Sequence, residues 1–94
     1  MGSSQPTSKP DLYVVARIVQ VLRDNGQTKR TQLAMMTGLS YDALVRYLEW
    51  MNRKGFVRLD AEDNVHLTEE GHQVYDRLVN WILEYVGSLR FPRF

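Results

Sequence analysis

The side chains that could carry out acid–base or metal chemistry are few, and they do not form a catalytic pattern. The two histidines, His66 and His72, lack the spacing of a metal-binding motif, and we interpret both as surface residues. No serine is placed beside a base as an activated nucleophile, and the glycines are too dispersed to form a phosphate-binding loop. The sequence therefore predicts a protein that is not an enzyme and that uses neither a metal nor a cofactor.

Charged residues have a more informative spacing in the segment 41–54. Four of them fall on one side of a helix drawn over this segment: Asp42, Arg46, Glu49 and Arg53. The opposite side carries Leu44, Leu48 and Met51, which a helix would bury. Spacing of four residues is also that of ordinary surface ion pairs. The pattern alone leaves open whether this side of the helix is a binding face or a solvated face.

A second polar cluster, Lys29, Arg30 and Thr31, stands at the start of a short predicted helix. A helix N-terminus combined with cations can bind a phosphate group, whereas the alternative is a solvated loop. Further basic residues at Arg53 and Arg58 would extend the positive edge. Together these cations would supply the salt-dependent part of an affinity for a polyanion.

Hydrophobic spacing predicts the elements that position these residues. The order is helix, short strand, helix, helix, β-hairpin, helix, in a mainly α fold with a small hairpin (α+β), and the strand is one interpretation of residues 27–29. We expect a flexible N-terminal tail over 1–10, one domain over 11–89, and a basic aromatic tail over 90–94. The helices are expected over 11–24, 31–37, 41–54 and 68–89, and the hairpin over 56–59 and 65–67 around the turn 60–64.

Three residue types at the junction between the second and third helices favour a close helix crossing and a tight turn. Ala34 is small where the two helices would cross, and Gly38 supplies unusual turn dihedrals. Ser40 is a good N-cap that would make the first turn of the next helix rigid. These features fit a helix-turn-helix, although any helical hairpin with a glycine turn would share some of them.

Five short motifs carry a family likeness: Gln32-Leu33-Ala34, Thr37-Gly38-Leu39-Ser40, Leu44-Val45-Arg46-Tyr47-Leu48, Lys54-Gly55-Phe56-Val57 and Leu67-Thr68-Glu69-Glu70-Gly71. At these motifs the chain resembles winged helix-turn-helix regulators, most closely small archaeal winged-helix DNA-binding proteins and more distantly MarR-like regulators. The resemblance covers 11–89. It implies double-stranded DNA binding through helix 41–54 in the major groove, backbone contacts from the preceding helix and the hairpin, called the wing, and dimerisation through terminal helices.

Carried over residue by residue, the resemblance assigns groove contacts to the first turn and exposed side of helix 41–54. Arg46 suits a guanine edge, and Tyr41 suits a thymine methyl group or a phosphate. The expected DNA-binding residues are Lys29, Arg30, Thr31, Ser40, Tyr41, Asp42, Arg46, Arg53 and Arg58.

The expected wing departs from the family's pattern because its turn, residues 60–64, is acidic. Carboxylates beside phosphates would be repelled. We therefore expect the wing to stay out of the groove, or to touch DNA only through Arg58 at its base. This departure also leaves a role in protein interaction open.

The last helix carries two apolar seams. The first is Val74, Leu78, Trp81 and Tyr85, and the second is Tyr75, Val79, Ile82, Val86 and Leu89. A helix that covers only its own domain needs a single stripe. The second seam therefore predicts a partner, most simply the same helix of a second copy, although a broad stripe over a small core is the alternative. The expected homodimer interface is Tyr75, Leu78, Val79, Trp81, Ile82, Tyr85, Val86 and Leu89.

Composition limits the function further. The net charge of +1 gives no independent support for nucleic-acid binding. The absence of cysteine fits an intracellular protein, no apolar run approaches the ~20 residues that span a bilayer, and the start of the chain lacks a signal-peptide core. We expect a cytoplasmic, nucleoid-associated homodimeric transcriptional regulator. The alternatives are a nucleoid-associated protein of low sequence specificity and a winged-helix module that binds proteins.

Overall fold

The computed structural model describes residues 10–86, without the side chains of 82, 83, 85 and 86. Nearly all of the tail expected over 1–10, and the whole of the tail expected over 90–94, lie outside the described residues. Within them the element order is the predicted one, so the mainly α fold with a small sheet is confirmed. The elements are α1 (Leu12–Asn25), β1 (Thr28–Lys29), α2 (Arg30–Thr37), α3 (Tyr41–Arg53), β2 (Val57–Leu59), β3 (Asn64–Leu67) and α4 (Glu69–Val86).

Local capping explains where the helices begin and end. The Asp11 carboxylate accepts a hydrogen bond from the Tyr13 N–H, so α1 starts one residue later than predicted. Ser40 caps α3 as predicted, with its hydroxyl accepting from the Ala43 N–H at 3.1 Å. Gly38 ends α2 with a φ of 77°, a left-handed conformation that favours glycine. The third helix ends at Arg53 instead of Lys54, which forms its C-cap.

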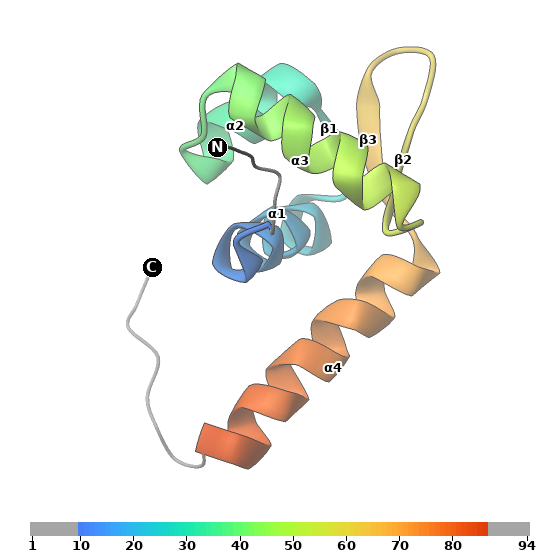
Figure 1. Cartoon of the computed structure of the whole chain (residues 1–94). Helices are drawn as coiled ribbons and strands as arrows, with labels where there is room; N and C mark the ends of the chain where they lie inside the picture. Colours follow the sequence, from blue (N-terminus) through green and yellow to red (C-terminus); the bar gives the residue numbers. More distant parts are fainter. Residues whose placement is uncertain (1–9, 87–94) are drawn as a thin grey trace, which may run out of the picture.

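The wing is part of a three-stranded antiparallel sheet in the order β1-β3-β2 (Figure 1). The hairpin pairs β2 with β3, for example Val57 with Leu67. On its other side β3 pairs with β1, which places Lys29 opposite Asn64. The short strand expected near residues 27–29 therefore exists, and it ties the start of α2 to the wing.

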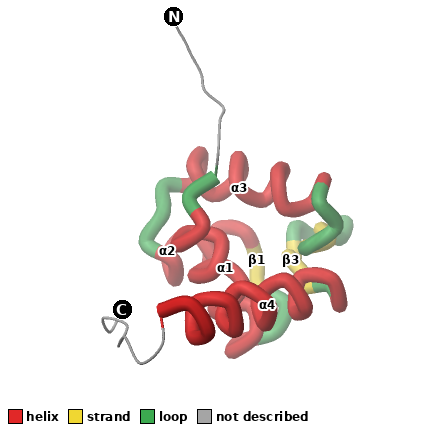
Figure 2. Tube along the Cα trace, turned by 60° about the horizontal axis from the view of Figure 1, so that its bottom comes forward, coloured by secondary structure: helices red, strands yellow, loops and turns green. Residues whose placement is uncertain are grey.

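A single core lies between the helices and the sheet, and α1 runs through its middle. Figures 1 and 2 show α3 on one side of α1 and α4 on the other. The core includes the residues predicted for the buried side of α3. Its buried hydrophobic members are Val15, Ile18, Val19, Leu22, Leu33, Ala34, Leu44, Leu48, Met51, Val57 and Val65.

The last helix starts in direct contact with the chain segment that enters the wing. The Thr68 hydroxyl donates to the Gly55 carbonyl at 2.6 Å and accepts from the Gly71 N–H at 3.0 Å. A Cβ on Gly71 would clash with the Phe56 carbonyl oxygen and would lie 2.7 Å from Leu67 Cδ1. Glycine is therefore required where α4 crosses this segment. No helix within residues 10–86 has the length and apolar character needed to span a membrane.

Candidate nucleic-acid interface

The exposed side of α3 is the first component of the candidate interface. Leu44, Leu48 and Met51 are buried, and the four charged residues predicted for the other side are all exposed: Asp42, Arg46, Glu49 and Arg53. The division of this helix into an apolar side and a charged side is therefore confirmed. Figure 1 shows α3 at the edge of the molecule, and the exposure of its charged residues places them on the solvent side of the helix.

The first turn of α3 carries the predicted groove contacts Ser40 and Tyr41. Ser40 is exposed while its hydroxyl fixes the first turn, and the Tyr41 side chain is 42% exposed. The Arg30 guanidinium lies over the Tyr41 ring, with its central carbon 5.7 Å from the ring centroid. This cation–π contact joins the start of α2 to the start of α3.

The cations expected to bind phosphate at the start of α2 are held by the wing. Lys29 Nζ donates to the Glu62 carbonyl at 3.0 Å, and Arg30 Nη2 pairs with Asp63 Oδ1 at 3.0 Å. The Arg30 N–H also donates to the Asp63 carbonyl at 3.2 Å. Sequence reasoning missed these contacts, because nothing in the local pattern links residues 29–30 to the wing. Thr31 is exposed, as expected for a surface contact.

The acidic turn of the wing is internally bonded. Asp60 Oδ1 accepts from the Glu62 N–H at 2.9 Å and the Asn64 N–H at 3.0 Å, and Asp60 Oδ2 lies 2.9 Å from His66 Nε2. The His66 hydrogen bond, followed by the Asn64 N–H, lowers the pKa of Asp60 well below its ordinary value. His66 is half-buried, and its bond to Asp60 is a contact that the prediction of a surface histidine did not include.

The remaining predicted cations, Arg53 and Arg58, are exposed on α3 and β2. Between them the ammonium group of Lys54 lies 5.7 Å from the centroid of the Trp50 ring, and Trp50 meets Phe56 edge to face at 5.9 Å. Trp50 thus packs the end of α3 against the segment that leads to β2.

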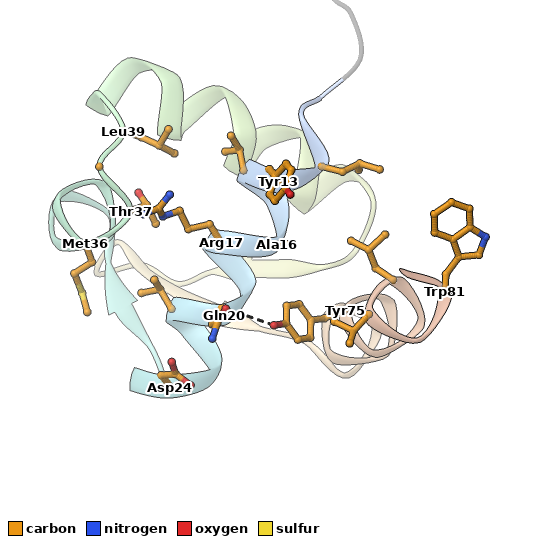
Figure 3. A pocket seen from close by; sticks show the side chains of 16 residues that line it. Tyr13, Ala16, Arg17, Gln20, Asp24, Met36, Thr37, Leu39, Tyr75 and Trp81 are labelled. Carbon is orange, nitrogen blue, oxygen red and sulfur yellow. Dashed lines mark hydrogen bonds between the residues drawn. The ribbon is translucent and has the colours of Figure 1, made fainter. Parts of the chain in front are cut away.

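A groove lies between α1, α4 and the turn that joins α2 to α3 (Figure 3). Its volume is about 1070 Å³, and most of its lining is apolar. The predicted interface residues Tyr75, Leu78, Val79 and Trp81 line it. The side chains of Ile82, Tyr85 and Val86, together with the whole of Leu89, lie outside the described residues. Sequence reasoning missed the contribution of the opposite wall, where Leu12 and Tyr13 of α1 are exposed.

Contacts within the chain join α4 to α1 beside this groove. The Arg23 guanidinium pairs with Asp76 at 2.8 Å and lies 4.7 Å from the Tyr75 ring centroid. The hydrogen bond to Asp76 raises the pKa of Arg23. The Tyr75 hydroxyl donates to Gln20 Oε1 at 3.5 Å (Figure 3). Tyr75 is therefore occupied in holding α4 to α1 of its own chain, and its contact with a second copy stays a prediction.

The fold and these surfaces define a winged helix, and comparison with known families agrees. A family described as winged helix-turn-helix matches residues 11–85. The chain belongs to this winged helix-turn-helix family. A comparison with curated proteins found no match.

Solved structures with the same fold include MarR-family regulators. The MarR family transcriptional regulator SPO1453 from Silicibacter pomeroyi is 25% identical with a TM-score of 0.64, over 76% of this chain and 53% of that chain. BpsR of Bordetella bronchiseptica, whose DNA binding is regulated by 6-hydroxynicotinic acid, is 20% identical with a TM-score of 0.66. The match covers 92% of this chain and 72% of that chain. The regulator BldR from Sulfolobus solfataricus is 23% identical with a TM-score of 0.59. The match covers 82% of this chain and 64% of that chain. This chain spans little more than half the length of the Silicibacter pomeroyi regulator.

Proposed function

We propose that this chain binds double-stranded DNA and acts as a transcriptional regulator, with α3 in the major groove. One observation carries the proposal: α3 is capped and packed on one side, while its charged side is exposed from Asp42 to Arg53. A rigid, exposed helix of this kind fits the width of the major groove. Membership of the winged helix-turn-helix family and likeness to a MarR-family regulator support the same function.

The proposed contacts divide into two kinds. Arg46 would read a base edge, because its guanidinium suits the O6 and N7 acceptors of guanine, with Ser40, Tyr41 and Asp42 beside it. Phosphate contacts would position the helix without reading sequence. We assign the phosphate contacts to Lys29, Arg30, Thr31, Arg53 and Arg58.

We further propose a homodimer in which the groove between α1 and α4 receives the second copy. Trp81 is 57% exposed and Tyr13 is 60% exposed, on opposite walls of this groove. Burying such large apolar side chains stabilises association. A dimer would also present two copies of α3 to successive major grooves of one duplex.

The DNA proposal is tested by comparing Arg46→Ala with Arg77→Ala. Both remove one exposed arginine, but Arg77 lies on α4. Loss of a base contact costs about 1 to 3 kcal/mol, so we expect Arg46→Ala to weaken binding by about tenfold in fluorescence anisotropy, whereas Arg77→Ala stays near wild type. Equal losses in the two variants, or no binding by the wild type, would contradict the proposal.

The dimer proposal is tested by Trp81→Ala, with Gln73→Ala as an exposed control on the same helix. We expect sedimentation equilibrium to show weaker self-association for Trp81→Ala at unchanged helix content, and wild-type association for Gln73→Ala. A wild type that stays monomeric at every concentration would overturn the proposal.

A second candidate is a winged-helix module that binds proteins. It is favoured by the contacts of Lys29 with the Glu62 carbonyl and of Arg30 with Asp63, because both cations are then bonded to the wing instead of being available to DNA phosphates. Binding to random and genomic duplexes across a salt series distinguishes the candidates. No binding to either duplex favours the protein-binding module, and an affinity ratio near one with a steep salt dependence indicates a nucleoid-associated protein of low specificity.

A further inference from the structure

The tip of the wing touches the start of α2 at the point where the proposed function places phosphate contacts. We propose that Asp63 occupies Arg30 in place of a DNA phosphate, so that this carboxylate sets the affinity of the protein for DNA. The inference rests on the proposed function and deepens it. It identifies Asp63 as a residue that restrains binding, although no sequence pattern marks it as part of the site.

The backbone of the wing holds Asp63 in place. The turn bends at Asp63 with a φ of 68°, a left-handed conformation that few residues other than glycine adopt. The Asp63 carbonyl accepts from the Arg30 N–H at 3.2 Å, and the Asp63 N–H donates to the Asp60 carbonyl at 3.1 Å. Pairing of Lys29 with Asn64 in the sheet fixes the register beside it. The carboxylate therefore faces Arg30 because several contacts hold the turn.

The ion pair is weak enough for a DNA phosphate to replace Asp63 as the partner of Arg30. Only one nitrogen of the guanidinium, Nη2, reaches an Asp63 oxygen, and the Nε atom is buried with no hydrogen-bond partner among the described residues. The Asp63 side chain is 62% exposed. A partly exposed, singly bonded pair of this kind is weak. A phosphate oxygen can therefore replace the carboxylate at the outer nitrogen without unfolding the turn.

Arg30 also connects this exchange to the reading helix. Its guanidinium lies over the Tyr41 ring at the first turn of α3 while it pairs with Asp63. Replacing the Asp63 carboxylate by a neutral group would free the guanidinium for a phosphate beside Tyr41 and would remove one negative charge from the path of the DNA backbone. Both effects act in the same direction, toward tighter binding.

The test is Asp63→Asn, with Glu62→Gln as the matched control. Asparagine tolerates the left-handed conformation, so the turn is kept while its charge is lost. Glu62→Gln removes an equal charge one residue away, and the structure uses only the Glu62 backbone to hold Lys29. Thermal melts confirm that both variants are folded.

We expect Asp63→Asn to tighten DNA binding about threefold to fivefold at low salt and to steepen the salt dependence by about one phosphate contact. Glu62→Gln is expected to change affinity by less than about twofold. In the Asp63→Asn background, Arg30→Gln should weaken binding more than it does in the wild type, because only there is the guanidinium free.

Several outcomes would overturn the inference. Equal gains from Asp63→Asn and Glu62→Gln would reduce the effect to net charge, and weaker binding by Asp63→Asn would mean that the carboxylate positions Arg30 productively. If the wild type binds DNA and Asp63→Asn binds equally, this inference fails while the proposed function stands. If neither protein binds DNA while both are folded, both fail.

Discussion

Replacing Gly71 by alanine tests how tightly α4 is seated on the segment that enters the wing. Alanine would normally stabilise a helix by about 1 kcal/mol relative to glycine. Here the added methyl group meets the Phe56 carbonyl, and the Phe56 carbonyl carbon lies 3.2 Å from the new Cβ. Backbone atoms cannot rotate away as a flexible side chain can, so the strain falls at the upper end of the usual cost, about 3 kcal/mol.

The net expectation for Gly71→Ala is a loss of about 2 kcal/mol in the free energy of unfolding, which corresponds to roughly 10 °C in Tm for a domain of this size. Thermal and urea unfolding followed by circular dichroism at one fixed protein concentration measure it, since association makes Tm depend on concentration. Gln73→Ala, exposed in the same helix, is the control and should change stability by less than about 0.5 kcal/mol. A Gly71→Ala variant as stable as the wild type would refute the close approach described for this crossing.

Two further predictions concern local hydrogen bonds. Ser40→Ala removes the cap on the Ala43 N–H, and urea unfolding should show a loss of about 1 kcal/mol; unchanged stability would mean that solvent replaces the cap without cost. The folded-state pKa of Asp60 is lowered, so the stability that its carboxylate contributes is present above the unfolded-state pKa of about 3.9 and is lost as the pH falls below it. Asp60→Asn should therefore lower Tm at neutral pH and flatten its decline under acid, whereas parallel declines for variant and wild type would contradict this role.

Sequence reasoning located the helices because the signals that end them are local. Ser40 and Gly38 act within one turn of the chain, and the apolar spacing of α3 needs only its own residues. Predicted and observed helix ends differ by at most one residue within the described part of the chain. At Asp11 the difference arises because a side-chain hydrogen bond makes this residue the N-cap instead of the first helical residue.

The candidate site was less accessible to prediction because its contacts join distant segments. Arg30 and Asp63 are 33 residues apart, and their pairing depends on β1 joining the far edge of the hairpin. The bond between His66 and Asp60 spans only six residues, but it depends on the way the hairpin folds back on itself. Neither the charge nor the spacing of these residues shows which partner each one meets.

The pairing of β1 with β3 has a mechanical consequence. Because α2 begins where β1 ends and β1 is bonded to the wing, the wing and the start of α2 form one stiff unit whose dimensions are fixed before any duplex arrives. Under the proposed function, a duplex that binds across this unit would have to adapt its own shape to it. The energy of that deformation depends on base sequence, so this short strand would let the protein favour pliable DNA at positions that it never touches.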